Sequence, residues 1–498
     1  MPFELETAVQ PAGLRRVAID PVSRVEGHGK VTILLDADDR VHQVRLHIVE
    51  FRGFEKFAQG RPFWELPVMV QRLCGICPVS HHLAAAKALD MIVGATRLTP
   101  TAEKIRRLMH YGQILQSHAL HFFHLASPDL LFGFDSDVAK RNIVAVAAEY
   151  TDITRKGVLL RKFGQEVIRL TAGKRIHGTG AIPGGVNKAL TRGERDALRE
   201  DVYTMIGWSR EAVTLVKRLH FANVSLYNSF GAFRSNLMSL VADDGALDFY
   251  HGALRARDAA GKLIFDHVDY RRYWEQITEE VKPWSYMKFP YLRALGPQTG
   301  WYKVGPLVRV QNCDHIPTPL ADAARREFVD FGGGMPIHAT LAYHWARMIE
   351  MLFAAEEIKA LLHDEDLLGG DLVVTGERQR RGIGVIEAPR GTLIHHYRIN
   401  ADDQVMRANL IVSTTHNNQA LNEAIRQVAK RYLDGRKLTE GLLNHIEVAI
   451  RAFDPCLSCA THALGQMPLA VELVDADGTC LDQLQRDGDG NVSQPGRA

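Results

Sequence analysis

The chain has 498 residues, of which 46% are hydrophobic and 24% are charged, as in ordinary water-soluble globular proteins. The formal net charge is only +2 and the basic residues are scattered, so nothing predicts a nucleic-acid-binding surface. No apolar run reaches the ~20 residues that a membrane-spanning helix needs. The N-terminus lacks the basic start, apolar stretch and cleavage site of a secretory signal. We therefore expect a cytoplasmic protein with no membrane span.

Taken in chain order, the first predicted elements are strands in residues 15–52, where β-branched residues flank a polar turn, DADDR (36–40). Apolar residues at three- and four-residue spacing then predict helices at roughly 66–93, 100–126, 136–170, 190–230, 338–363 and 416–434. Gly/Pro-rich segments at 173–185 and 290–301 predict loops, and a second β region is expected near 371–413. The pattern is that of a predominantly helical α+β chain, followed by a polar tail from Asp475 that we expect to pack poorly.

Cysteine is rare, with six residues in the whole chain, which excludes a disulfide scaffold and favours a reducing compartment. Four of the six form two CxxC pairs, Cys74/Cys77 and Cys456/Cys459, which together offer four soft metal ligands. A structural zinc site is one interpretation. Zinc ribbons, however, place their pairs about 15–20 residues apart, whereas residues 78–455 separate these two. The spacing alone favours a catalytic or redox metal and leaves zinc open.

The residues beside each pair predict how the thiols are presented. Pro78 follows Cys77 and precedes an apolar helical stretch, so Cys77 is expected at the N-cap and Pro78 at the first helical position. Asp454-Pro455 suggests the same arrangement for the second pair, with both cysteines one turn apart on a helix. Two helix N-termini, whose dipoles favour thiolates, would then point at one metal.

Five motifs carry a resemblance to the nickel–iron hydrogenase large subunit: RVEGH (24–28), RGFE (52–55), RLCGICP (72–78), EAPRG (387–391) and DPCLSCATH (454–462). The likeness extends from about residue 17 to 474 and is closest to the cytoplasmic, bidirectional, NAD-coupled type. Relatives in respiratory NADH:quinone reductase share the fold but lack the four cysteines. The resemblance implies a central helix bundle with a small N-terminal β region and peripheral β elements. It also implies reversible heterolytic cleavage of H2.

The resemblance assigns roles to the four cysteines. Cys74 and Cys456 would be terminal nickel ligands, and Cys77 and Cys459 would bridge nickel to an iron that carries CO and cyanide. The first proton acceptor would be a terminal thiolate, that of Cys456, and Glu26 would receive the proton next. On the sequence alone, a surface glutamate in a β turn is the simpler interpretation of Glu26.

Four further residues would surround this centre. Arg390, next to Pro389, resembles the arginine that lies over the open metal position and contacts a cyanide, although a solvated loop arginine competes with that interpretation. Asp454 would be its partner. His81 lies four residues after Cys77 and is expected to hydrogen-bond a bridging sulfur, or else to be a buried structural histidine.

A second metal, magnesium or iron, is implied near the mature C-terminus. Glu55, a backbone carbonyl near Leu410 and His462 would hold it, since oxygen ligands suit a hard cation; an ordinary salt bridge is the alternative for Glu55. One departure concerns Ser117, which stands where several membrane-bound relatives carry an aspartate close to the active-site arginine. The two remaining cysteines, Cys313 and Cys480, match no ligand motif.

The chain has no further cysteine cluster, no GxGxxG and no flavin motif, so its electrons must leave through partners. The resemblance implies an iron–sulfur small subunit together with a diaphorase that holds FMN, iron–sulfur clusters and NAD. Metal-insertion chaperones and a maturation protease are implied too, the latter cutting after His462. Residues 1–462 would then be a single catalytic domain and 463–498 a removable extension, unless 463–474 is a permanent strand. A non-catalytic subunit of a respiratory-like complex is the alternative function.

Overall fold

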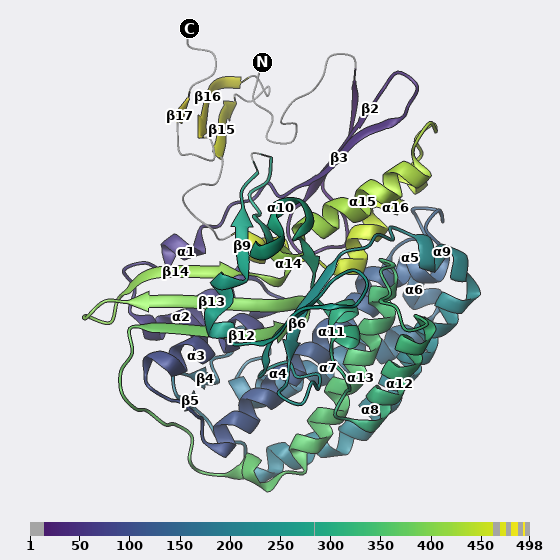
Figure 1. Ribbon diagram of the computed structural model, residues 1–498. Helices are drawn as coiled ribbons and strands as arrows, with labels where there is room; N and C mark the ends of the chain where they lie inside the picture. Colours follow the sequence, from purple (N-terminus) through teal and green to yellow (C-terminus); the bar gives the residue numbers. More distant parts are fainter. Residues whose placement is uncertain (1–13, 283, 462–468, 475–479, 487–491, 494–498) are drawn as a thin grey trace.

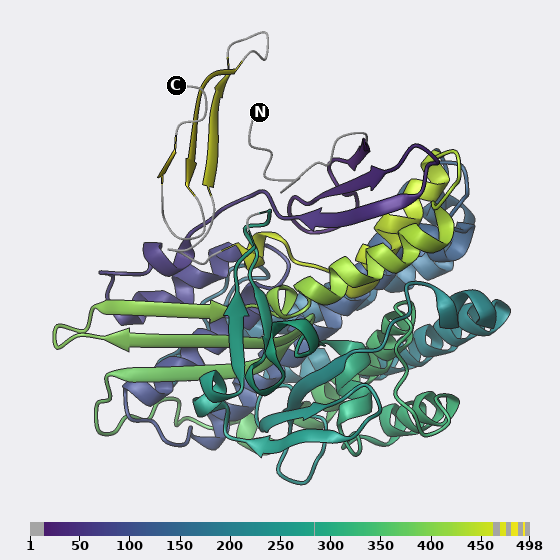
Figure 2. The same ribbon diagram turned by 45° about the horizontal axis from the view of Figure 1, so that its top comes forward.

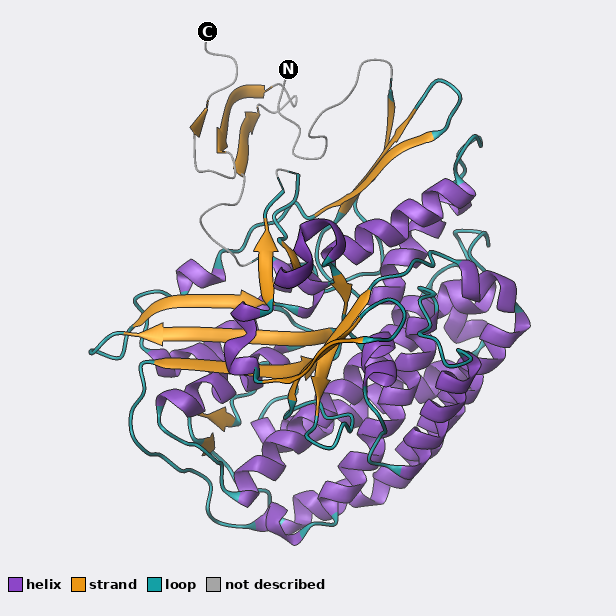
Figure 3. Cartoon of the chain, in the orientation of Figure 1, coloured by secondary structure: helices purple, strands orange, loops and turns teal. Residues whose placement is uncertain are grey.

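The computed structural model describes residues 14–282, 284–461, 469–474, 480–486 and 492–493. Long helices form a bundle on one side of the molecule, and several small sheets pack beside it (Figures 1 and 3). Its four longest helices are α4 (Pro100–Leu120), α7 (Thr151–Ala172), α8 (Arg192–Ala222) and α13 (Ala342–Leu362). Helix α13 packs against both α4 and α8, and α4 packs against α7. The predominantly helical α+β class with a central bundle is therefore confirmed.

Local sequence explains where the bundle helices begin and end. Thr99 caps α4 by accepting from the Ala102 amide, and Thr191 and Glu194 form a capping box at the start of α8. Helix α7 ends at Gly173, whose φ of 82° suits glycine. Helix α13 is buried on almost every face, including its polar residues His344, Arg347 and Glu350, which places it at the centre of the bundle.

The other helices are short. They are α1 (Phe54–Phe57), α2 (Leu66–Met69), α3 (Pro78–Ile92), α5 (Ser127–Phe132), α6 (Ile143–Glu149), α9 (Val224–Ser229), α10 (Gly296–Thr299), α11 (Pro306–Asn312), α12 (Pro319–Phe331), α14 (Ser413–His416), α15 (Asn418–Tyr432) and α16 (Glu440–Phe453). A π-helical segment, His121–Ala126, continues α4, and six 3-10 turns complete the helical set of the described ranges. The expected helix at 66–93 is broken at 74–77, because Cys74 is extended and Pro78 starts a new helix.

The N-terminal β region is an antiparallel sheet in the order β1-β2-β3. Its strands are β1 (Arg15–Ile19), β2 (Lys30–Leu35) and β3 (Val41–His47), and the last two are joined by the predicted polar turn. Strand β3 packs on α15, and Figure 2 shows the sheet lying along α15 and α16. The connection from β1 to β2, residues 20–29, carries the RVEGH motif.

A second β region, predicted near 371–413, is the antiparallel sheet β12-β13-β14, with strands Arg381–Ala388, Gly391–Ile399 and Val405–Ile411. It packs directly on α3. Gly382 and Gly384 permit this close approach, because a Cβ at either position would collide with a backbone carbonyl of α3. The turn between β12 and β13 is the EAPRG motif, so the sheet delivers that motif to α3.

Several elements were absent from the sequence-based expectation. The sheet β11-β6-β7-β8 and the pair β10-β9 comprise β6 (Asn236–Val241), β7 (Ala253–Arg257), β8 (Leu263–Val268), β9 (Ile277–Glu280), β10 (Phe289–Leu292) and β11 (Tyr302–Lys303). The loop predicted at 290–301 was wrong, because it contains part of β10 and helix α10. The loop predicted at 173–185 contains β4 (Ala181–Ile182) and reaches β5 (Gly185–Val186). Strands this short carry too few alternating residues to be recognised.

Beyond the main body, the described C-terminal residues form a separate sheet. It contains β15 (Leu469–Val474), β16 (Cys480–Arg486) and β17 (Val492–Ser493), which pair with one another. Figures 1 and 2 show this sheet standing apart from the rest of the fold. In the part of the chain that the structure describes, no helix is both long and apolar enough to cross a membrane.

Candidate metal centre

The four cysteines of the two CxxC pairs meet at one buried point. Their sulfur atoms all lie within 4.8 Å of one another. Cys456 Sγ lies 2.8 Å from Cys459 Sγ and 3.3 Å from Cys74 Sγ, and Cys77 Sγ lies 3.6 Å from Cys459 Sγ. No side chain of the four is more than 5% exposed. The fold therefore gathers four soft ligands from the two ends of the chain at a site closed to bulk water.

The first pair has the local structure that its sequence predicts. Cys77 is the N-cap of α3 and Pro78 is the first helical residue. Cys74 is extended after a 3-10 turn, Val70–Leu73, and its sulfur accepts the Ile76 amide at 3.1 Å. Two glutamines of α4, Gln113 and Gln116, donate to the Ile76 carbonyl and thereby stabilise the loop between the two cysteines.

The second pair does not begin a helix, and this part of the sequence-based prediction was wrong. Asp454 is the C-cap of α16, not an N-cap, and has left-handed φ and ψ of 56°. Aspartate tolerates this conformation, and Pro455 cannot continue a helix. Cys456 therefore lies in an irregular segment, and Cys459 lies in a 3-10 turn, Ser458–Ala460.

Distant chain segments hold this second pair instead. Residue 26 forms a β-bridge with residue 456, in which the Leu457 amide donates to the Glu26 carbonyl at 2.9 Å. The Cys456 amide donates to Thr414 Oγ1 at 2.9 Å. Thr414 was not expected from the sequence, since nothing in its surroundings, STTH, distinguishes it from an ordinary buried threonine.

The electrostatics of the cluster call for a cation. Burial and the neighbouring thiols raise the pKa of Cys456 well above its usual value, and burial raises that of Cys459 likewise. Hydrogen bonds from the thiols of Cys456 and Cys459 lower the pKa of Cys74 well below its usual value. One thiolate is thus stabilised at the expense of the others, and only a bound cation allows all four to ionise together.

Glu26 reaches the cluster from the loop between β1 and β2. Its Oε2 lies 3.0 Å from Cys456 Sγ and accepts the Ser458 amide at 3.1 Å. Burial raises the pKa of this carboxyl above its usual value, and the negative Cys74 sulfur adds to the shift. Gly27, with φ of 81°, makes the approach possible, because a Cβ there would lie 2.6 Å from the Ser458 nitrogen. The surface-turn interpretation of Glu26 is therefore wrong.

Arg390 extends toward the cluster from the β12–β13 turn, and Asp454 binds its guanidinium group. Its Nε donates to the Asp454 carbonyl at 2.6 Å and its Nη2 to Asp454 Oδ1 at 3.1 Å. Its Nη1 is buried and has no hydrogen-bond partner among the described residues. A small cavity lies beside the sulfurs, lined by Cys77, Ser80, His81, Ala388, Pro389, Arg390, Leu393, Val412, Ser413, Thr414 and Cys456. A donor without a partner thus borders an open space next to the thiolates.

His81 contacts the sulfur of Cys459. The distance from its Nε2 to Cys459 Sγ is 3.3 Å, and its Nδ1 lies 3.1 Å from His395 Nε2. His395 in turn contacts the Tyr397 hydroxyl at 2.7 Å. Neither His395 nor Tyr397 was singled out from the sequence. Both residues follow Leu393 at two-residue spacing on β13, so all three share one face of a buried strand. Polar side chains on such a face were the signal that the sequence offered.

Glu55 is buried on α1 and its Oε1 accepts the Leu410 amide at 2.8 Å. The fold therefore places Glu55 next to residue 410, near which the carbonyl ligand of the second metal was expected. His462 lies outside the described residues. Ser117 is fully buried in α4, and its hydroxyl has no hydrogen-bond partner within the described part of the chain.

Cys313, which matched no ligand motif, is buried outside the cluster, and burial raises the pKa of its thiol to about 11. It is a packed residue of the core. Backbone atoms of Cys480 belong to β16.

The sequence is similar to those of known hydrogenases. The family model described as nickel-dependent hydrogenase matches residues 52–132 and 238–462, and one described as HoxL-like matches residues 16–51. The beta subunit of the NAD-reducing hydrogenase HoxS of Cupriavidus necator is 48% identical over 95% of this chain and 100% of its own. One subunit of the F420-non-reducing hydrogenase of Methanothermobacter marburgensis is 40% identical over 94% of this chain and 100% of its own.

Solved structures extend the agreement. The crystal structure of an NAD⁺-reducing NiFe-hydrogenase in the H2-reduced state has a TM-score of 0.89 and 61% identity, and covers 90% of this chain and 99% of its own. The Ni-Fe-Se hydrogenase from D. vulgaris Hildenborough, at 23% identity and a TM-score of 0.73 over 90% of this chain and 100% of its own, shares the fold. The family model matches most of the chain, and the four cysteines form one buried cluster. The chain therefore belongs to the nickel-dependent hydrogenases, as the catalytic large subunit of an oxidoreductase that acts on hydrogen.

Proposed function

We propose that this subunit cleaves H2 reversibly and heterolytically, and that the electrons pass first through an iron–sulfur small subunit, then through a flavin-containing diaphorase, to NAD. The observation that carries the proposal is the four-thiolate cluster with Glu26 and Arg390 beside it. The acceptor is inferred from the relatives named NAD-reducing, which match the chain at 48% and 61% identity. Cytoplasmic residence fits the free thiols of Cys74, Cys77, Cys313, Cys456 and Cys459.

The donor set suits a nickel–iron pair. Cys74 and Cys456 would be terminal nickel ligands, and Cys77 and Cys459 would be shared with the iron, because thiolates are soft ligands that can bridge two metals. The small cavity beside the sulfurs is lined by apolar residues (Ala388, Pro389, Leu393 and Val412) as well as polar ones, and Arg390 Nη1 offers it a donor without a partner among the described residues. The CO and cyanide on the iron would lie on this side of the cluster. When bound, this centre supplies the electron-accepting chemistry that polarises and splits H2.

The chain's own residues would then handle the proton. The Cys456 sulfur is the first base, and Glu26 Oε2, 3.0 Å away, is within reach to take the proton from it. Arg390 Nη1 offers an N–H to the diatomic ligands while Asp454 holds the other side of the guanidinium. Pro389 restricts the backbone before Arg390. His81 offers its Nε2 to the Cys459 sulfur and orients that ligand.

A magnesium ion, or iron, would bind at Glu55, the Leu410 carbonyl and His462. The hydrogen bond from the Leu410 amide to the Glu55 carboxylate supports the proximity of these two residues, and a carboxylate with a carbonyl suits a hard cation. Metal analysis of a Glu55→Gln variant, which should lose this metal and retain nickel, tests the proposal. Retention of both metals would contradict it.

We also propose that a maturation protease removes residues 463–498 after metal-insertion chaperones have delivered the centre. Two observations support the cut: the family match ends at residue 462, and the NAD⁺-reducing relative of known structure is covered to 99% yet spans only 90% of this chain. Strand β15, at 469–474, would be lost with its sheet. The intact mass of the active large subunit tests this, and full activity with 463–498 still attached would refute it.

The decisive experiment for the function uses the complex purified with its partners. Nickel and iron should be present in equal amounts, infrared bands of iron-bound CO and cyanide should appear, and H2 should reduce NAD. One zinc per chain without such bands would support a structural zinc site instead. A metal-loaded complex that reduces artificial dyes but not NAD would overturn the acceptor alone.

A further inference from the structure

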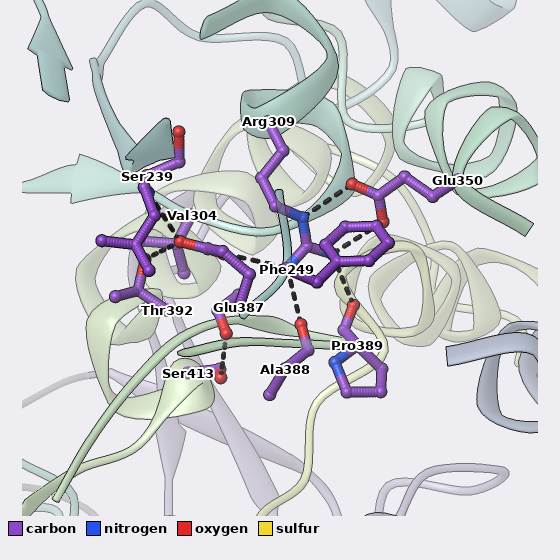
Figure 4. A network of polar contacts seen from close by, with 12 residues as sticks. Ser239, Phe249, Val304, Arg309, Glu350, Glu387, Ala388, Pro389, Thr392 and Ser413 are labelled. Atoms are coloured by element: carbon purple, nitrogen blue, oxygen red, sulfur yellow. Dashed lines mark hydrogen bonds and ion pairs between the residues drawn. The ribbon is translucent and has the colours of Figure 1, made fainter. Parts of the chain in front are cut away.

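Arg309, on α11, is the centre of a buried ionic network that ends on the EAPRG turn (Figure 4). Its side chain is fully buried, as are those of Glu350 on α13 and Glu387 on β12. Arg309 Nε and Nη2 each donate to a different oxygen of Glu350, both at 2.6 Å. Arg309 Nη1 donates to Glu387 Oε2 at 2.9 Å. One guanidinium thus bridges two carboxylates.

The same guanidinium also binds the backbone immediately before Arg390. Its Nη1 donates to the Ala388 carbonyl at 2.6 Å and its Nη2 to the Pro389 carbonyl at 3.1 Å. A guanidinium has five N–H donors in a fixed plane, and these five contacts use all of them. A lysine, with three donors on one nitrogen, cannot reproduce this pattern.

Other helices hold the carbonyls on either side. The Glu387 carbonyl accepts from His110 Nε2, on α4, at 3.0 Å, and the Gly391 carbonyl accepts from Ser413 Oγ, on α14, at 2.7 Å. The backbone that flanks Arg390 is therefore held from three helices. Among these contacts, Arg309 alone binds two successive peptide groups, those of Ala388 and Pro389 directly before Arg390.

The two carboxylates are themselves fully engaged. Glu387 Oε1 accepts from the Leu240 amide at 2.8 Å and from Thr392 Oγ1 at 2.7 Å, and Glu350 Oε2 lies 3.0 Å from His118 Nε2. A satisfied buried network is rigid. Replacing buried ion pairs with apolar residues is often neutral or stabilising, so net stability is a poor reason for this arrangement. What the network supplies is a fixed backbone position.

We propose that Arg309 is a positioning residue for the hydrogenase reaction: by holding the Ala388 and Pro389 carbonyls it fixes Arg390, so that Nη1 faces the ligands of the metal centre. The inference rests on the proposed function, because it assigns Arg390 to those ligands. Asp454 holds the guanidinium of Arg390, and Arg309 holds the backbone from which that side chain extends. A shift of this backbone would move the guanidinium, and displacements of about 1 Å can cost about 100-fold in rate.

The test is Arg309→Lys in the purified complex, which keeps the charge and removes the five-donor pattern. Nickel and iron should remain near the wild-type content. The infrared bands of the iron-bound cyanides should shift or broaden, because Arg390 no longer meets them in one geometry. Turnover with H2 should fall about 10- to 100-fold. Wild-type cyanide bands in the metal-loaded variant would overturn the proposal.

A matched control is Arg106→Lys. Arg106 is also fully buried, pairs with Asp90 and donates to the Ile182 and Gly185 carbonyls. This variant should lower thermal stability comparably while its cyanide bands stay at the wild-type frequencies. If it shifts the bands as Arg309→Lys does, the effect is general destabilisation and the proposal fails.

Glu350→Gln serves if Arg309→Lys does not fold or load metal. It keeps the side-chain volume and removes the charge that holds two nitrogens of Arg309. The same cyanide bands must shift, and unchanged bands would again overturn the proposal. Absence of cyanide bands in the wild-type complex would refute the proposed function instead, so the two failures are distinguishable.

Discussion

The two CxxC pairs are alike in sequence but are held by different kinds of structure. Cys74 and Cys77 lie where their neighbours in the chain put them, at the start of a proline-initiated helix. Cys456 and Cys459 lie after the end of α16, in a segment positioned by residues 26 and 414. The first pair thus takes its conformation mainly from its own helix, with added support from Gln113 and Gln116 of α4. The second takes its conformation from segments distant in the chain.

In the proposed mechanism, the proton-handling residues lie beside the second pair. Glu26 contacts Cys456 and Ser458, and Asp454, directly before that pair, binds Arg390. The irregular segment at 454–459 is open to side chains from several elements. The first pair, at a helix N-terminus, is supported mainly by its own helix.

The largest effect is expected from Cys77→Ser or Cys459→Ser. Each sulfur would be shared by two metals, so either change should abolish the nickel–iron pair and H2 activity, whichever pair it belongs to. Metal analysis of the purified complex measures this. Cys313→Ala, which removes a buried thiol outside the cluster, should leave both metals in place. An active Cys77→Ser enzyme would contradict the shared-ligand assignment.

A selective effect is expected from Glu26→Gln, which touches only the second pair. It keeps the hydrogen bond from Ser458 but removes the titratable oxygen, so turnover and H/D exchange with solvent should fall at least about 100-fold. Nickel and iron content should not change. Glu50→Gln, a change at an exposed carboxylate near the same loop, is the control. Near-normal turnover in Glu26→Gln would show that protons leave by another route.

Two glycines test whether the second pair depends on distant segments. Gly27→Ala places a methyl group 2.6 Å from the Ser458 nitrogen at a φ of 81°, and should displace the loop and cost about 1–3 kcal/mol. Gly75→Ala, within the first pair, meets nothing within 4 Å and should be nearly neutral. Metal content and thermal unfolding of the two variants measure the contrast. Equal losses would show that both pairs are equally sensitive.

The smallest effect is expected from Pro78→Ala. Helix α3 should still begin at the same place, because Cys77 remains its cap, and stability should fall by only about 0.4–1 kcal/mol through the freer unfolded chain. Thermal unfolding of the metal-loaded complex would record a downward shift of a few degrees or less, with nickel content unchanged. Loss of nickel would mean that the first pair is less self-contained than its local structure indicates.

The sequence by itself determined much of the fold and the identity of the metal ligands. Long stretches with helical periodicity, such as 100–126 and 338–363, were predicted because apolar residues at three- and four-residue spacing repeat over many residues. The start of α3 was predicted because the cap and the first helical residue are adjacent in the chain. Five short motifs sufficed to assign the family, since they occur in one order along one chain.

Only the tertiary structure decided the surroundings of those ligands. Asp454-Pro455 has the composition of a helix start, yet it ends α16, because the preceding helix extends to Phe453 and its end is held against residues far away. Thr414 and Arg309 carry no local signal, since an ordinary buried polar residue and a ligand-orienting one look alike in sequence. Their roles depend on contacts across long chain separations, which local patterns do not encode.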